Sequence, residues 1–234
     1  MDGTLGQPGG LSVTQAVRRR AAARRYLARA VEPALLRELL ELAARAPSGG
    51  NLQPWRVHVL TGAALRAFTG AMTLRLAEPG VEPAEYAVYP AGLAEPYRAR
   101  RREAGAQRYA ALGARDRDPA TLRGMLEDNA RFFGAPCGLF FCVPRHFGAP
   151  QWSDVGMYMQ TLMLLATERG LATCPQEVWA QWPDTLRRLL DLPPDWMVFA
   201  GMALGYADVD HPINRIRTAR APLSEFAVFH GDAA

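Results

Sequence analysis

Two arginines near the start of the sequence have the spacing of an anion-binding pair. Arg20 and Arg24 stand four residues apart within the run Arg-Arg-Arg-Ala-Ala-Ala-Arg-Arg-Tyr at positions 18–26. Residues 14–30 are rich in arginine and predict the start of a helix, on which residues four apart share one face. Two guanidinium groups on one face can hold a single anion from two points. A solvated basic helix face is the alternative, and these residues by themselves favour it.

Two loops with polar side chains are the next candidates for a binding site. Residues 46–55 read Ala-Pro-Ser-Gly-Gly-Asn-Leu-Gln-Pro-Trp, a helix stop followed by polar side chains and free N–H groups before a buried strand. An ordinary helix-to-strand turn rarely needs Ser, Asn and Gln together, so a binding loop is favoured here. Residues 170–177, Gly-Leu-Ala-Thr-Cys-Pro-Gln-Glu, predict a second loop after a buried helix. For that loop the residues alone favour a plain connection.

Several kinds of chemistry have no support in the sequence. All 27 basic residues are arginine, which excludes a Walker A lysine, a Schiff-base lysine and a Ser–Lys pair. No GxGxxG, GxSxG or HExxH motif is present, and the four histidines lack ligand spacing, so hydrolase triads and metal sites are not expected. The three cysteines are not in CxxC spacing and predict neither a disulfide framework nor a zinc site. A net charge of +4 suits an anionic ligand but is too small to demand nucleic acid.

The length and the apolar content predict one domain. The chain has 234 residues, of which residues 1–12 are Gly-rich and polar and are expected to form a flexible tail without the features of a signal peptide. Residues 13–234 are expected to fold as a single domain. No run reaches the ~18 apolar residues that a membrane span needs, so no membrane partner is expected. With few cysteines and no disulfide framework expected, the expected location is the cytoplasm.

Hydrophobic patterns predict a sheet surrounded by helices. We expect strands at 55–61, 137–143 and 196–206, and helices at 32–46, 63–73, 97–117, 121–133, 153–169 and 185–192. The helix at 153–169, which Asp154 is expected to cap, is apolar nearly all round and must be central or lie in an interface. Residues 78–96 are rich in proline and cannot form a regular core element, so residues 78–134 are interpreted as a lid-like excursion. The irregular, apolar end of the chain is expected to pack on a partner chain.

Taken together, four motifs resemble those of the FMN-dependent nitroreductase family over about residues 13–229. They are the Arg-rich segment at 20–26, Ala-Pro-Ser-x-x-Asn-x-Gln-Pro-Trp at 46–55, Gly-Leu-x-x-x-Pro-x-Glu at 170–177 and Arg-x-Pro-Leu at 220–223. Their order and spacing match those of the family. Residues 85–98 and 132–136 are similar to the branch that includes nitrobenzoate reductase. The resemblance implies an α+β, nitroreductase-like fold with a central, mainly antiparallel sheet flanked by helices, in an intertwined homodimer with FMN between the subunits.

The resemblance also implies roles for individual residues. Arg20 and Arg220 should pair with the FMN phosphate, and Arg24 should lie near N1 and O2 of the flavin, where its charge favours the reduced anion. Ser48 and Asn51 should donate hydrogen bonds from the partner subunit. Relatives often carry Arg and Ser where this chain has alanine at 21 and 22, so any contact there must come from the backbone. The residues expected to line the cofactor are Arg20, Ala21, Ala22, Arg24, Pro47, Ser48, Gly49, Asn51, Gln53, Pro175, Gln176, Glu177, Arg217 and Arg220.

The implied reaction is the ping-pong reduction of a small, electron-poor aromatic, with NAD(P)H as co-substrate. Because the flavin carries the chemistry, no side chain is named as catalytic and no metal is expected. Tyr86 and Tyr89 are candidates for aromatic walls of the substrate site. The arginines at the start of the helix expected at 97–117 could attract a carboxylated aromatic, although a solvated helix face is favoured. These arginines are Arg98, Arg100, Arg101 and Arg102.

Other interpretations of the same residues stay open. Within the same scaffold, quinone or enone reduction, reductive dehalogenation and flavin fragmentation are alternatives, and a flavin-binding protein without turnover is another. Nucleic-acid binding through the arginines would leave the loop at 47–51 unexplained. Cys174 is interpreted as a small buried thiol rather than a redox group, and the large aromatics near the loops as packing residues.

Overall fold

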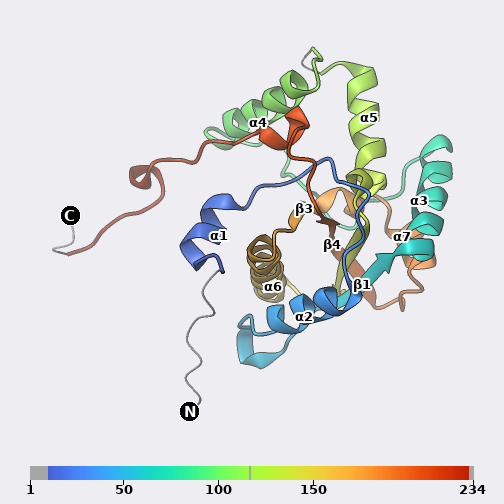
Figure 1. The fold of residues 1–234 in the computed structure, drawn as a ribbon, viewed down its shortest axis with the longest axis horizontal. Coiled ribbons are helices and arrows are strands. Elements are labelled where there is room, and N and C mark those ends of the chain that lie inside the picture. Colours follow the sequence, from blue (N-terminus) through green and yellow to red (C-terminus); the bar gives the residue numbers. More distant parts are fainter. Residues whose placement is uncertain (1–9, 116, 232–234) are drawn as a thin grey trace.

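A four-stranded sheet lies at the centre of the computed structural model, which describes residues 10–115 and 117–231 (Figure 1). The strand order is β1-β2-β4-β3, and all neighbouring strands are antiparallel. The expected α+β fold, with a central antiparallel sheet flanked by helices, is confirmed. The strands are β1 at Arg56–Thr61, β2 at Cys137–Pro144, β3 at Ala172–Gln176 and β4 at Trp196–Gly205.

Seven α-helices in the described residues surround this sheet, together with five short 3-10 turns (Figure 1). The expected helices are present with shifted ends; the one predicted to run to residue 117, for example, ends at 111. None of the helices among the described residues is long and apolar enough to cross a membrane. The helices are α1 at Val13–Arg19, α2 at Pro33–Ala43, α3 at Gly62–Ala77, α4 at Tyr97–Ala111, α5 at Pro119–Ala130, α6 at Ala149–Glu168 and α7 at Pro183–Leu189. The 3-10 turns are η1 at Gly49–Asn51, η2 at Phe132–Gly134, η3 at Glu177–Gln181, η4 at Pro212–Arg215 and η5 at Leu223–Glu225.

The two faces of the sheet pack against two separate hydrophobic clusters. In β2, Leu139 and Phe141 belong to the cluster with α2 and α6, while Phe140 and Cys142 belong to the cluster with α3, η3 and α7. This assignment follows from the period of two along a strand. Every residue of β2 except the last is buried, as its continuous apolar sequence predicts. Close packing leaves no room for a side chain at Gly201, where a Cβ would come within 2.4 Å of Trp179.

The prediction that residues 14–30 start a helix holds only as far as Arg19. The chain after α1 is extended because its backbone pairs with the sheet: Ala23 N donates to Thr173 O at 3.0 Å, and Leu27 N donates to Tyr206 O at 2.9 Å. Arg20 and Arg24 therefore do not share a helix face.

The prediction that Asp154 caps a helix is also wrong. The helix α6 begins four residues before the expected start, because Pro150 occupies its first turn and the Gln151 side chain accepts from Gly148 N at 3.3 Å. Asp154 lies inside the helix and is only 5% exposed. Its carboxylate accepts a hydrogen bond from Gly49 N, with 3.3 Å to each oxygen.

Two further expectations need correction. Residues 170–177 do not form a loop, because residues 172–176 pair with β4 as the edge strand β3. The strand β1 is not buried, since it is the opposite edge of the sheet, and Val59 is 38% exposed.

The excursion and the chain end lie outside the sandwich of sheet and helices. Residues 78–96 contain neither helix nor strand, as expected from their prolines, and lead into α4 and α5. After η4 the chain runs away from the body as an arm (Figure 1). Its apolar side chains are exposed, Phe226 by 70% and Val228 by 80%.

Candidate functional site

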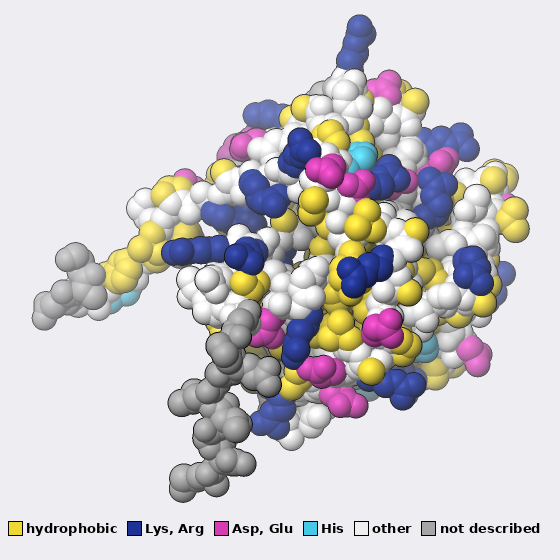
Figure 2. Space-filling model, in the orientation of Figure 1, with side chains coloured by type: hydrophobic (Ala, Val, Ile, Leu, Met, Phe, Trp, Pro, Cys, Tyr) yellow, Lys and Arg dark blue, Asp and Glu magenta, His cyan; other side chains and the backbone are white. Residues whose placement is uncertain are grey.

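An open hollow of about 750 Å³ lies where the extended segment after α1 passes the end of α6. Its lining brings together Arg20, Ala21, Ala22 and Arg217, which are four of the residues predicted to hold a cofactor. Residues 170–172 complete this part of the wall. The volume is within the range of about 300–1,000 Å³ that is typical of small-molecule sites. Figure 2 shows arginine side chains spread across the middle of the molecule beside the C-terminal arm.

The guanidinium groups beside β3 lack acidic partners. Among the described residues, those of Arg20 and Arg24 take part in no ion pair. Arg24 is fixed instead through its backbone N–H, which donates to Asn214 Oδ1 at 2.7 Å. Half-buried arginines without carboxylates are unusual, because burial of a charge is costly unless it is compensated. The arrangement suits an anionic ligand.

The far end of the chain brings another guanidinium to this cluster. Burial and the neighbouring Arg220 both lower the pKa of Arg20. Arg220 Nη1 contacts only atoms of the two preceding residues, at 2.8–3.0 Å. Arg217 Nη1 is held similarly by Asn214 O and Ile216 O. Arg20 and Arg220 are thus near enough for their charges to interact, although 200 positions separate them in the sequence.

The loop at 47–53 lies elsewhere in the protomer, beside the N-terminal half of α6. Three residues in this loop have positive φ angles, namely Gly50, Asn51 and Gln53 at 58°, 56° and 49°. Ser48 Oγ accepts from Gln53 N at 3.0 Å, and Asp154 accepts from Gly49 N. Pro47, Gly49, Asn51 and Gln53 are exposed, and Ser48 is half-buried. The loop is therefore held in a strained shape with its side chains directed outward.

The end of β3 contributes the remaining predicted cofactor residues. Pro175 is half-buried and Glu177 is exposed. Gln176 is buried, and its side-chain amide donates to Asn129 O at 2.8 Å and to Asn129 Oδ1 at 3.2 Å. The side-chain nitrogen of Gln176 is thus bonded to α5, while its Oε1 is buried without a hydrogen-bond partner among the described residues. The sequence motifs did not single out three residues near these segments, which are Asn129 in α5, Asp154 in α6 and Arg108 in α4.

The thiol in β3 is not poised for reaction. Cys174 is 2% exposed, and burial raises the pKa of its thiol to about 11, although the guanidinium groups of Arg24, Arg108 and Arg20 favour the thiolate. The interpretation of this residue as a small buried thiol is confirmed. Trp179 is fully buried as a packing residue, as expected. No cluster of three or more His, Cys, Asp or Glu side chains that could hold a metal is found among residues 10–115 and 117–231.

The two tyrosines proposed as substrate walls are placed differently from each other. Tyr86 is half-buried, stacks on Phe199 with ring centroids 6.2 Å apart, and donates from its hydroxyl to Phe199 O. That carbonyl is available because the register of β2 and β4 shifts here, which leaves Phe199 unpaired. Tyr89 is 52% exposed, and the guanidinium carbon of Arg101 lies 4.0 Å from its ring centroid.

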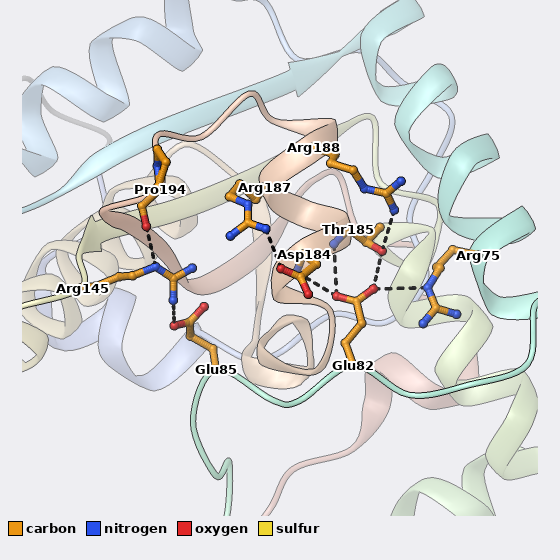
Figure 3. Close-up of polar contacts among 9 residues, drawn as sticks. All are labelled: Arg75, Glu82, Glu85, Arg145, Asp184, Thr185, Arg187, Arg188 and Pro194. Carbon is orange, nitrogen blue, oxygen red and sulfur yellow. Dashed lines mark hydrogen bonds and ion pairs between the residues drawn. The ribbon is translucent and has the colours of Figure 1, made fainter.

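A clasp of ion pairs fastens the beginning of the excursion (Figure 3). We use the name clasp for Arg75, Glu82, Glu85, Arg145 and Thr185. Glu82 accepts from Arg75 Nε at 3.2 Å and from Thr185 N at 3.1 Å, and it also accepts from the N–H of residue 184 at the start of α7. Glu85 pairs with Arg145, whose Nε donates to the carbonyl of residue 194 at 2.9 Å. The clasp fixes the irregular segment of the chain that leads to Tyr86.

Comparisons with known proteins agree with the motifs. A family model described as "Nitroreductase family" matches residues 17–206. A nitrobenzene nitroreductase from Ectopseudomonas oleovorans is 39% identical over 214 residues, which cover 91% of this chain and 94% of that protein. A 4-nitrobenzoate reductase from Pseudomonas putida is 34% identical over 212 residues, with 91% and 92% covered. The crystal structure of an FMN and NADPH-dependent nitroreductase from Sphigopyxis sp. strain HMH superimposes with a TM-score of 0.91 at 43% identity, covering 95% of this chain and 100% of that one.

Proposed function

Because this chain belongs to the nitroreductase family, we propose that it is an FMN-dependent oxidoreductase that uses NAD(P)H to reduce nitroaromatic compounds. The observation that carries the proposal is the group of arginines beside β3 that has no acidic partner. Arg20, Arg24 and Arg220 take part in no ion pair among the described residues, and the charge of Arg220 acts on Arg20. The phosphate of a bound FMN would supply the negative charge that compensates these arginines.

The residues present fit FMN. Arg20 and Arg220 would bind the dianionic phosphate, for which charge-assisted hydrogen bonds from guanidinium groups are well suited. Arg217 is the neighbouring candidate on the wall of the hollow, and the backbone at Ala21 and Ala22 supplies N–H groups. Arg24 would lie at the pyrimidine edge of the ring. Bound FMN supplies the redox chemistry, accepting a hydride from NAD(P)H and passing electrons to the nitro group.

We further propose that the site is shared between two subunits. Within one protomer the loop at 47–53 touches α6 at Asp154, whereas the hollow at Arg20 touches α6 at Thr167. At 1.5 Å per residue these positions are about 20 Å apart along the helix. A second protomer related by two-fold symmetry, with its α6 packed antiparallel, brings its loop to the hollow of the first. The exposed apolar arm, including Phe226, is suited to wrapping that partner.

In this arrangement the loop and β3 complete the cofactor site. Ser48 and Asn51 would donate hydrogen bonds across the subunit interface, with Pro47, Gly49 and Gln53 shaping the contact. Residues 175–177 would run past the ring, with Gln176 acting through its backbone because its side chain is bonded to α5.

The excursion supplies the proposed wall for the aromatic acceptor. We propose that residues 13–234 form one domain, with residues 78–134 over the acceptor side. Tyr86 and Tyr89 are the aromatic candidates in this wall, and the clasp holds its first part in place. The buried thiols suit a reducing compartment, in support of a cytoplasmic location.

An anaerobic titration of the purified protein tests the activity. We expect the yellow absorbance of bound flavin to bleach on addition of NADPH or NADH and to return on addition of nitrobenzene, with a hydroxylamine product. Bleaching without recovery on any nitroarene would overturn nitroreduction while leaving flavin binding intact. Protein that binds no FMN would overturn the whole proposal.

Mixed dimers test the shared site. The Arg20→Ala variant weakens the phosphate end, and Asp154→Ala weakens the loop. At an FMN concentration that fills wild-type sites but not the weakened ones, both sites of each homodimer should stay largely empty. If each site combines the hollow of one subunit with the loop of the other, a mixed dimer of the two variants has one intact site and one doubly damaged site. Differently tagged subunits, co-expressed and purified as mixed dimers, should therefore retain about half of the wild-type flavin. A mixed dimer as empty as the parents would place the whole site within one subunit.

A further inference from the structure

An arginine of the excursion lies next to the proposed flavin edge and has no acidic partner. Arg108, near the end of α4, lines a small cavity together with Arg24, Leu112 and Phe133. It is half-buried, and none of its guanidinium nitrogens takes part in a hydrogen bond or ion pair within residues 10–115 and 117–231. Burial and the neighbouring Arg24 both lower the pKa of Arg108. The two cations thus line the same small cavity.

The other charged groups around this cavity do not compensate Arg108. Asp128 is the carboxylate in the lining, and it lies 3.2 Å from Arg131 Nη2 and 3.9 Å from Arg25 Nη2. His211 is also in the lining, and its Nδ1 accepts from Ile213 N at 3.2 Å. The carboxylate in this lining is therefore already shared by two other arginines.

The remaining arginines of α4 behave differently from Arg108. Arg98 and Arg100 are exposed and paired, with Glu95 at 2.8 Å and with Glu225 at 2.6 Å. Arg101 lies over the ring of Tyr89, and Arg102 is exposed. These side chains match the solvated helix face that the sequence favours for them.

We propose that Arg108 is a specificity-determining residue that binds the carboxylate of an acidic nitroaromatic acceptor, such as a nitrobenzoate. This inference rests on the proposed nitroreductase function and adds the substrate class. Arg108 belongs to the same excursion as Tyr89, the exposed candidate wall, whose phenol contributes to the charge environment of Arg108. On its other side it adjoins Arg24, which is assigned to the ring edge. A carboxylate placed between wall and flavin meets a planar guanidinium that can bind both of its oxygens.

Comparing an uncharged with an acidic nitroarene separates this role from others. Steady-state constants for 4-nitrobenzoate and nitrobenzene are measured with the FMN-loaded wild-type protein and with Arg108→Gln. We expect the KM for 4-nitrobenzoate to rise about 10- to 100-fold in the variant, the range expected for loss of a charge-assisted hydrogen bond. The KM and kcat for nitrobenzene and the flavin content should stay within about twofold. Arg108→Lys, which keeps the charge without the planar fork, should recover part of the loss.

A matched control removes a charge from the solvent side of the same helix. Arg102→Gln should leave both substrates unaffected, which separates direct binding from a general loss of positive charge. Equal losses for both nitroarenes, or loss of flavin from Arg108→Gln, would overturn the proposal and assign Arg108 to the cofactor. Wild-type protein that reduces nitrobenzene but not 4-nitrobenzoate would overturn it too. Protein that reduces neither compound would instead overturn the proposed function.

Discussion

Two arginine-rich regions of this molecule differ in how their charges are compensated. In the clasp, Arg75 and Arg145 are each held by a carboxylate, and Arg145 also by a backbone carbonyl (Figure 3). Beside β3, Arg20, Arg24 and Arg108 have no such partner among the described residues. Arginine thus stabilises the fold through ion pairs in one region, whereas in the other its guanidinium groups remain available to bind a ligand.

The difference follows from where each region lies in the chain. The clasp joins the excursion to α3, α7 and the loop after β2, and its partners come from the chain itself. The cluster beside β3 is assembled from the two ends of the chain and from α4, with apolar and small residues filling the space between. A fold that leaves several guanidinium groups partly buried and uncompensated loses stability. A ligand that binds only the folded state returns that stability.

The largest effect is expected at the open cluster. Arg20→Ala should weaken FMN binding about 10- to 100-fold, because one charge-assisted contact to the phosphate is lost. The apo protein should be no less stable, since removing Arg20 also relieves its repulsion with Arg220. Flavin dissociation constants and melting temperatures of apo and holo protein measure the two effects separately. Arg18→Ala, an exposed change on α1, is the control, and unchanged flavin affinity in Arg20→Ala would remove this residue from the site.

A somewhat smaller effect is expected at the loop that faces the partner. Asp154→Ala removes the acceptor for Gly49 N and should cost about 1–3 kcal/mol, because a hydrogen bond to a charged group is lost. Part of this cost should appear as weaker flavin binding, since residues 50–53 lose the support for their strained angles. Asp154→Asn keeps an acceptor oxygen and should lie close to wild type in the same flavin titration. Equal flavin affinity for all three proteins would show that the loop needs no such support.

The clasp should respond in stability rather than in flavin affinity. Burial disfavours the charged form of Glu82, but hydrogen bonds from Thr185, Arg75 and residue 184 outweigh it and hold the pKa of the carboxyl below its usual range. Its contribution to stability is therefore complete above the ordinary glutamate pKa of about 4.3 and is lost as the pH falls through the lower folded value. Glu82→Gln should lower the free energy of unfolding by about 1–3 kcal/mol at pH 7.

Denaturant unfolding at several pH values measures this contribution. The difference between wild type and Glu82→Gln should shrink below about pH 4.3, where the wild-type carboxyl also becomes neutral. Glu78→Gln, an exposed change in the same segment, should have little effect at any pH. A constant difference down to the acid limit would mean that shape, rather than charge, matters at position 82.

Several parts of this picture could be predicted from the sequence, and the reasons are local. The buried strand at β2 follows from an uninterrupted apolar run, and α2 follows from its apolar spacing and Pro33. The four motifs identify the family because their order along the sequence does not depend on the secondary structure that each segment adopts. The helical spacing of Arg20 and Arg24 was the wrong reason to group them, because Arg20 lines the larger hollow and Arg24 lines the small cavity with Arg108.

The rest depends on partners distant in the sequence. Alanine and arginine favour helix locally, but the edge of β3 captures residues 22–23 and extends them. The role of Asp154 depends on a loop 105 positions away. Arg108 is one of several arginines in α4, and only packing reveals which of them faces inward. The available signal was its place on the helix, four residues after Ala104 and four before Leu112.

The smallest effect on flavin content and turnover is expected from a substitution at Cys174. This residue tests whether nearby positive charge can ionise a buried thiol and make it reactive. Three arginines surround this thiol, yet burial keeps its pKa at about 11. At pH 8 about one thiol in a thousand is then ionised, so iodoacetamide should label the native protein very slowly. Cys174→Ala should keep flavin content and nitroarene turnover within about twofold. Rapid labelling with loss of activity would mean that the guanidinium groups outweigh burial, and that the cluster beside β3 also activates the thiol.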